Sequence, residues 1–102
     1  MKTITLTAII KKPYTGNEKK VEDLYEALAY YNREWCNKDE KIYHEIFESE
    51  YQGNEVIEVD LKIVMKKSIS CDLMLKEIRN KVLTLFKKRL VILVKANGST
   101  IN

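Results

Sequence analysis

The chain has 102 residues, 45% of them hydrophobic and 32% charged, with only one proline and three glycines. This composition is typical of one globular domain over residues 1–102, and it excludes a long linker, a low-complexity tract and a bilayer-spanning segment. The net charge of +3 conceals two oppositely charged regions, because residues 17–60 carry a balance of −8 and residues 61–102 carry +8.

A strand is expected from about Thr3 to Lys12, because apolar side chains alternate with others from Ile4 to Ile10. Threonines alternate through this run and two lysines close it, which is unlike the apolar core of a signal peptide. We therefore expect a cytoplasmic protein, in which Cys36 and Cys71 are free thiols. Their number and spacing do not provide the four soft ligands of a structural zinc site.

A helix is expected after the break at residues 13–16, from the favourable N-cap residue Asn17 to about Trp35. Its apolar residues recur at the i, i+3, i+4 and i+7 spacing of an amphipathic helix. We expect Trp35 to pack in the core, with exposure at the helix end as the alternative. The expected core stripe consists of Val21, Leu24, Tyr25, Leu28, either Tyr31 or Asn32, and Trp35.

A β-hairpin is expected around Gly53-Asn54, since glycine supplies the positive φ of a two-residue turn. After the turn, apolar residues alternate from Ile57 to Met65, which predicts a strand with one buried face. The run before the turn, from about Lys41 to Gln52, fits either a helix or a strand. We favour a strand, because the turn and the strand that follows it both require a partner.

A second helix is expected from an N-cap at Ser70, with Asp72 in its first turn. A short apolar strand then runs from Leu90 to Lys95 and ends at Asn97-Gly98, and residues 99–102 should form a loose tail. The last turn of the helix is expected to hold three basic residues, which suit the negative end of the helix dipole: Lys87, Lys88 and Arg89.

The element order β-α-β-β-α-β, with right-handed crossovers, predicts a ferredoxin-like fold. In this fold a four-stranded antiparallel sheet carries two helices on one face. Many unrelated activities occur on it, so the function has to be sought in particular surfaces.

The face of the sheet away from the helices is expected to carry Tyr43, Phe47 and Tyr51, and exposed aromatic patches usually mark association. We therefore predict that this face binds a protein partner or a second copy of the chain. An ordinary, partly exposed sheet face is one alternative. Stacking of RNA bases is another, although the neighbouring carboxylates would repel phosphate. Those carboxylates are Glu45, Glu58 and Asp60.

The basic second half predicts, as an alternative function, a nucleic-acid-binding patch on the second helix and at its ends. Solvated lysines at a helix terminus are the simpler explanation of the same residues. The patch would comprise Lys66, Lys67, Lys76, Arg79, Lys87, Lys88 and Arg89.

Residue patterns that suggest catalysis are sparse, and no cofactor motif is present. Cys71 is expected in the first turn of the second helix, but the only histidine, His44, is expected on the apolar face of its strand, which favours a structural cysteine. A third alternative is a metal-dependent nuclease that holds Mg²⁺ with Glu58, Asp60 and Glu45. A plain ion pair between Lys62 and Glu45 is the simpler prediction.

We therefore predict a non-catalytic regulatory or inhibitory protein that binds a protein or nucleoprotein partner as a homodimer, without a cofactor. A short chain rich in lysine and isoleucine would also suit an accessory protein of a phage or mobile element. The oppositely charged halves would steer the association of two copies.

Overall fold

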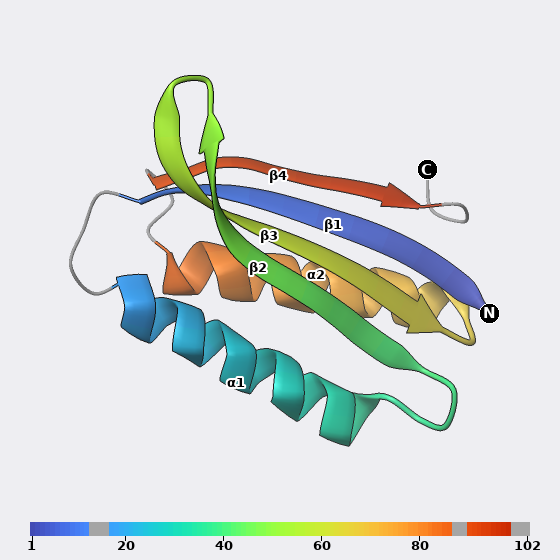
Figure 1. Cartoon of the computed structure of the whole chain (residues 1–102). Helices are drawn as coiled ribbons and strands as arrows, with labels where there is room; N and C mark the ends of the chain where they lie inside the picture. Colours follow the sequence, from blue (N-terminus) through green and yellow to red (C-terminus); the bar gives the residue numbers. More distant parts are fainter. Residues whose placement is uncertain (13–16, 87–89, 99–102) are drawn as a thin grey trace.

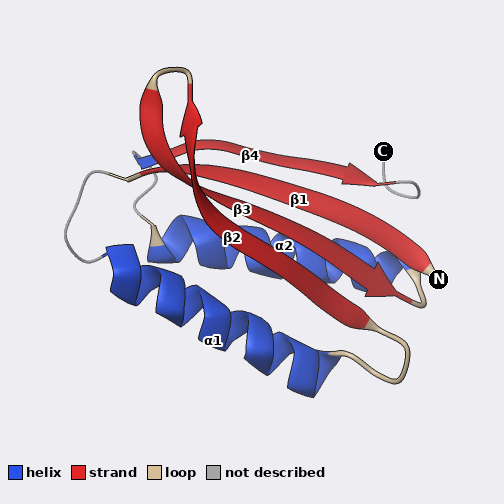
Figure 2. Ribbon diagram, in the orientation of Figure 1, coloured by secondary structure: helices blue, strands red, loops and turns tan. Residues whose placement is uncertain are grey.

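The computed structural model describes residues 1–12, 17–86 and 90–98 of the chain. Their four strands form one sheet in the order β2-β3-β1-β4, and every neighbouring pair is antiparallel. Both helices cover the same face of the sheet (Figures 1 and 2), so the ferredoxin-like prediction is confirmed. The elements are β1 (Lys2–Lys11), α1 (Asn17–Trp35), β2 (Lys41–Tyr51), β3 (Asn54–Met65), α2 (Ser68–Leu85) and β4 (Val91–Gly98).

The hydrophobic core lies between the sheet and the two helices. Alternation along β1 and β3 turns the predicted apolar sets, from Ile4 to Ile10 and from Ile57 to Met65, toward the helices, where they are buried. Each large aliphatic side chain buried in this way contributes about 1.5–3 kcal/mol of transfer free energy. The helices contribute Leu24, Leu28 and Tyr31 from α1 and Met74, Ile78, Val82 and the α2 C-cap residue Phe86.

The strand prediction for residues 41–52 is confirmed, whereas the predicted position of the turn is wrong. Tyr51 pairs with Asn54, so the turn residues are Gln52 and Gly53 instead of Gly53-Asn54. Both have positive φ, 49° and 79°, as a type I′ turn requires. The preferred dipeptides of this turn carry glycine second, which explains why the turn lies one residue earlier. The change moves each cross-strand partner by two residues and leaves every side chain on its predicted face.

The second helix starts and ends earlier than predicted. It begins at Ser68, after Lys67 in an extended N-cap conformation without a side-chain cap, so Ser70 lies in the first turn and is not the cap. It ends at Leu85, before the three basic residues that were expected in its last turn. Those residues, Lys87, Lys88 and Arg89, lie outside the described residues, and so do the predicted break at 13–16 and the predicted tail at 99–102. The last strand extends to Gly98, past its predicted end.

The core prediction for Trp35 is wrong. Its side chain is 45% exposed, while Tyr31, one turn earlier, is buried at 4%. The two rings meet edge to face at 5.9 Å between centroids, so Trp35 packs on the rim of the core. None of the described helices is long and apolar enough to cross a membrane.

Candidate interaction surface on the open face of the sheet

On the β2–β3 part of the sheet face opposite the helices, basic and acidic groups lie in separate rows, and Lys95 of β4 lies at the far end of the acidic row, beyond Thr7. The register aligns Tyr43 of β2 with Lys62 of β3, and it aligns Glu45 with Asp60 in the next row of the same face. A third row pairs Phe47 with Glu58. Successive rows are about 7 Å apart, because side chains on one face recur at every second residue. Within that distance the surface changes from aromatic and basic to acidic.

Tyr43 is the centre of the basic row, with 48% of its surface exposed. The ammonium groups of Lys41 and Lys62 lie 5.0 and 5.2 Å from the centroid of its ring, within the range of cation–π attraction. Two positive charges are therefore held beside one exposed ring. The predicted Lys62–Glu45 ion pair is wrong, because the turn at Gln52-Gly53 places Lys62 opposite Tyr43.

The acidic row, Glu45 and Asp60, lies next to Glu58 of the third row, and these three carboxylates repel one another. A hydrogen bond with Asp60, burial and the charges of Asp60 and Glu45 raise the pKa of Glu58. The Oγ1 of Thr7 donates a hydrogen bond of 3.0 Å to Oδ1 of Asp60. None of the ion pairs within the described parts of the chain involves these carboxylates. A cation brought to this row would relieve the repulsion.

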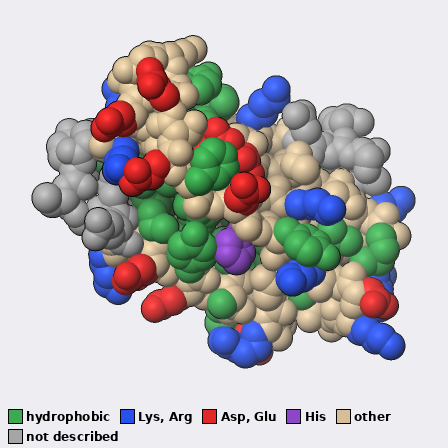
Figure 3. Space-filling view, in the orientation of Figure 1, with side chains coloured by type: hydrophobic (Ala, Val, Ile, Leu, Met, Phe, Trp, Pro, Cys, Tyr) green, Lys and Arg blue, Asp and Glu red, His purple; other side chains and the backbone are tan. Residues whose placement is uncertain are grey.

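A shallow hollow of about 340 Å³ lies between the basic and acidic rows. Its walls include Tyr43 and Lys62 on one side, Asp60 on the other, and Thr5 and Thr7 of β1. In the view of Figure 3, acidic side chains gather over the β2–β3 hairpin, and several basic side chains lie toward the other end of the molecule. The hollow therefore lies where the charge of the face changes sign.

The three aromatic residues predicted to bind a partner do not form one continuous patch. Tyr43, Phe47 and Tyr51 follow at intervals of four residues along β2, about 13 Å from one to the next. Phe47 is exposed and also lines a separate hollow of about 230 Å³ with Val21 and Tyr25 of α1. Tyr51 is half-buried beside the turn. Of the three aromatic residues, Tyr43 is the one whose ring lies next to two lysine ammonium groups.

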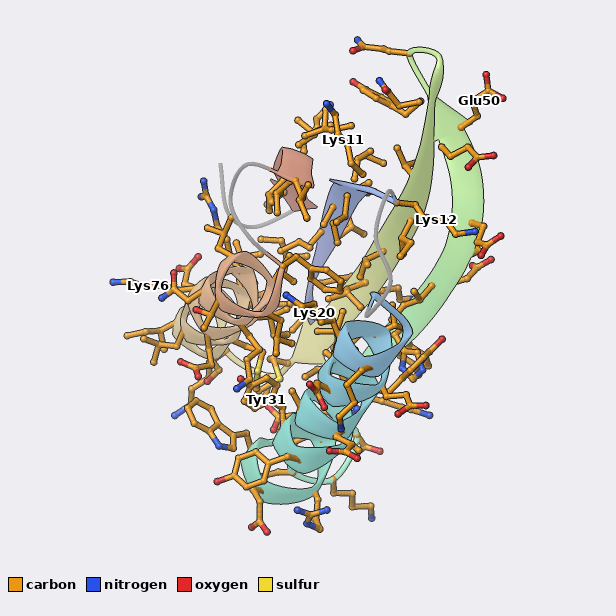
Figure 4. All side chains as sticks on the ribbon, turned by 90° about the vertical axis from the view of Figure 1, so that its left-hand side faces the viewer. Lys11, Lys12, Lys20, Tyr31, Glu50 and Lys76 are labelled. Carbon is orange, nitrogen blue, oxygen red and sulfur yellow. The ribbon has the colours of Figure 1, made fainter. Side chains whose placement is uncertain are left out.

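The predicted nucleic-acid residues that the structure describes are exposed but spread along α2. Lys66 and Lys67 precede the helix, and Lys76 and Arg79 lie on one side of it, at i and i+3. Lys76 points away from the molecule in Figure 4. Lys67 lies nine positions before Lys76, about 13 Å along the helix axis. A phosphate backbone, rather than a single phosphate, would be needed to contact both groups.

Cys71 and His44, the groups weighed for catalysis, lie in different surroundings. Cys71 is fully buried, its Sγ donates to the carbonyl of Lys2 at 3.5 Å, and burial raises the pKa of its thiol. The ring contact of His44 is with Tyr25, at 5.1 Å between centroids. The structure therefore favours the structural role predicted for Cys71. Among the described residues, no three His, Cys, Asp or Glu side chains are grouped so as to hold a metal ion, so the nuclease stays a prediction.

The sequence did not identify Lys41 as part of this surface, and it assigned Lys62 to a different partner. The signal that could have found them is the order of the turn residues, since glycine belongs in the second position of a type I′ turn. Counting partners from Gln52-Gly53 places Lys62 beside Tyr43 and Asp60 beside Glu45.

Comparison with known proteins supports the fold and leaves the function open. No family model and no curated protein matches the chain. Among solved structures, it resembles the de novo designed protein Ferredog-Diesel, with a TM-score of 0.61, 14% identity, and coverage of 93% of this chain and 83% of that one. It also resembles the de novo designed Foldit4, with a TM-score of 0.60, 11% identity, and coverage of 99% and 98%. At such identities the likeness shows the fold alone.

A third designed protein, LFR1 1 with ferredoxin fold, has a TM-score of 0.57 and 10% identity. The match covers 99% of this chain and 87% of that one. These designed relatives share the path of the backbone with this chain. The arrangement of charge on the open face therefore has to be explained from the residues of this chain.

Proposed function

We propose that the chain is a non-catalytic binding protein that docks through the open face of its sheet, and that its first partner is a second copy of itself. One observation carries this proposal: lysines around an exposed tyrosine lie beside three carboxylates, in the next two rows of the face, that form no ion pair with a described residue. A surface with both signs of charge side by side is complementary to itself.

A two-fold axis that lies in the interface, parallel to the sheet and to the two rows and passing between them, would satisfy both sets of charges. In such an isologous interface each contact occurs twice, so Lys62 of one copy would meet Asp60 and Glu58 of the other, and the reverse. Partial desolvation strengthens these attractions, and the ring of Tyr43 supplies apolar area between them. The repulsion by Asp60 and Glu45, which adds to the hydrogen bond with Asp60 and to burial in raising the pKa of Glu58, would be relieved on association.

Charge reversal with rescue tests the proposal. The Lys62→Glu and Asp60→Lys variants should each be monomeric, because each places like charges across the interface. The double variant should recover the dimer, because an isologous contact regains opposite charges when both are exchanged. The measurement is size-exclusion chromatography with light scattering at about 50 and 500 mM salt, which distinguishes the 12.0 kDa monomer from a species of twice that mass.

Lys38→Glu, an exposed lysine in the loop before β2, is the matched control and should leave the mass unchanged. A wild-type chain that stays monomeric at the highest concentration would refute self-association. A dimer that persists in both single-reversal variants would show that the interface lies on another surface.

Nucleic-acid binding is the second candidate, and the exposure of Lys66, Lys67, Lys76 and Arg79 supports it. Binding of a mixed oligonucleotide should then weaken steeply between about 50 and 500 mM salt, because phosphate contacts release counterions. The double reversal Lys76→Glu with Arg79→Glu should abolish it and leave the mass of the free protein unchanged. Binding that is unaffected by that reversal would remove this candidate.

The same proposal includes a regulatory or inhibitory role of the complex. It also includes a location in the cytoplasm and an origin in a phage or mobile element. A protein that only binds acts by covering or reshaping the surface of a protein or nucleoprotein partner. Two cysteines without a disulfide, Cys36 and Cys71, are consistent with a reducing compartment.

A further inference from the structure

A second hollow, of about 580 Å³, lies on the helical side of the molecule, away from the open face of the sheet. The antiparallel helices α1 and α2 form its two walls (Figure 1). Its lining extends along α1 from Asp23 to Trp35, about 18 Å of helix. That length accommodates about five residues of an extended peptide. We call this hollow the helix groove.

Three aromatic rings are arranged along the helix groove. Tyr31 is buried between the helices, and Tyr30 and Trp35 meet its ring edge to face, each at 5.9 Å with interplanar angles of 72° and 70°. Figure 4 shows Tyr31 on the side of α1 that faces α2. Tyr30 and Trp35 remain nearly half exposed. The guanidinium of Arg33 already lies 5.6 Å from the centroid of the Tyr30 ring, so this cluster accommodates a stacked guanidinium.

The charge of the helix groove is negative. Asp23, Glu26 and Glu77 line it, against the single ammonium of Lys81. Asp23 is paired with Lys19 at 3.0 Å. The other two carboxylates of the groove, Glu26 and Glu77, form no ion pair with a described residue. The hydroxyl of Tyr31 donates to Oε1 of Glu77 at 3.2 Å. Burial and the charge of Glu77 raise the pKa of Tyr31 to about 12, so this donor stays protonated at neutral pH.

We propose that the helix groove binds an arginine side chain carried by a basic, extended segment of another protein. A guanidinium is planar, stacks on aromatic faces and donates in pairs to a carboxylate. The exposed ring of Trp35 provides such a face, and Glu77, held by Tyr31, provides the carboxylate. The aromatic faces, the unpaired carboxylates and the length of the groove all match that one ligand.

Trp35 is the only tryptophan of the chain, so its fluorescence reports directly on the groove. The probe is a short glycine-serine peptide with a central arginine, titrated into the full-length protein. Its matched control carries citrulline, which has the shape of arginine without the charge. We expect a saturable change of Trp35 emission with the arginine peptide and at least about tenfold weaker binding of the citrulline peptide.

Glu77→Gln and Glu26→Gln should each weaken the arginine peptide several-fold, whereas Glu34→Gln removes the same charge from α1 outside the groove and should have no effect. Glu26→Gln keeps the test valid if loss of the Tyr31 contact unfolds the Glu77 variant. Lys62→Glu, on the opposite face, should leave the affinity unchanged even where it abolishes the dimer.

Three results would overturn the proposal. Equal binding of the arginine and citrulline peptides would exclude recognition of a cation. Binding of free N-methylguanidine as tightly as the peptide would exclude a peptide segment as the ligand. An emission spectrum that does not respond to millimolar arginine peptide would exclude the site.

Discussion

Glu40 connects two loops that are distant in the sequence. Its Oε1 accepts a hydrogen bond from the backbone N–H of Asn37, and its Oε2 accepts one from that of Lys66, both at 2.8 Å. These two bonds, that from Lys66 first, lower the pKa of Glu40. The carboxylate thus ties the loop before β2 to the connection between β3 and α2.

Replacement of Glu40 by Gln should destabilise the protein by about 1–2 kcal/mol at pH 7, because an amide can satisfy only one of the two N–H donors. Since the folded-state pKa is lowered, the stabilisation is complete above the ordinary value of 4.5 and is lost as the pH falls through the folded-state pKa. The difference between wild type and variant in denaturant unfolding should therefore shrink below pH 4.5. A deficit that is constant with pH would show that the charge is not involved.

The side chain of Asn32 forms two hydrogen bonds with the backbone of the edge strand β2. Its amide Nδ2 donates to the carbonyl of Ile42 at 3.1 Å, and its Oδ1 accepts from the N–H of Ile42 at 2.9 Å. Ile42 lies on β2, the edge strand, so Asn32 occupies the place of a neighbouring strand there. The sequence left open whether Tyr31 or Asn32 faces inward; Tyr31 enters the core and Asn32 covers the sheet edge.

At the level of elements, the β2–β3 hairpin decides which charges meet on the open face. Gln52→Asn should stabilise the protein by about 0.5 kcal/mol, because asparagine adopts positive φ more readily than glutamine. Gly53→Ala should cost about 1 kcal/mol. A Cβ at position 53 would contact nothing within 4 Å, so this cost would come from the backbone alone.

The matched control is Asn54→Ala, which should cost less than Gly53→Ala, because Asn54 belongs to β3 and the substitution removes only an exposed hydrogen bond of 3.4 Å from its Nδ2 to the carbonyl of Gln52. Urea unfolding of the three variants provides the measurement. A larger loss for Asn54→Ala than for Gly53→Ala would place the turn at Gly53-Asn54 and restore the register predicted from the sequence.

At the level of the whole molecule, the two halves of the chain are interleaved in the sheet. In the order β2-β3-β1-β4, neither β1 and β2 nor β3 and β4 are neighbours. Each half therefore contains two strands that do not pair with each other. Folding depends on long-range pairing between the halves.

A cut at the turn should abolish folding in each half. Fragments 1–52 and 53–102 should each lack a cooperative unfolding transition in circular dichroism, because neither can form a strand pair of the native sheet. An equimolar mixture should recover the native spectrum, since all three native strand pairs join one half to the other. A cooperative transition in either fragment alone would contradict this account.

The sequence by itself determined the kind and order of the elements and the face on which most side chains lie. Period-two alternation from Ile4 to Ile10 and from Ile57 to Met65, and the helical spacing from Val21 to Tyr31, reflect burial on one side of each element. Tyr25 is the exception in the helical stripe, because it is 39% exposed. That information is local, so it can be read without knowing the neighbours. The prediction of a ferredoxin-like fold followed from it.

Only the tertiary structure decided which residues stand next to one another. The partners of Glu45 and Lys62 depend on the position of the turn, where a change of one residue moves every pair by two. The exposure of Trp35 depends on how far α2 covers α1, which helical periodicity does not specify. Packing determines which residues are neighbours across strands and between helices. Both candidate surfaces could therefore be identified only from the assembled structure.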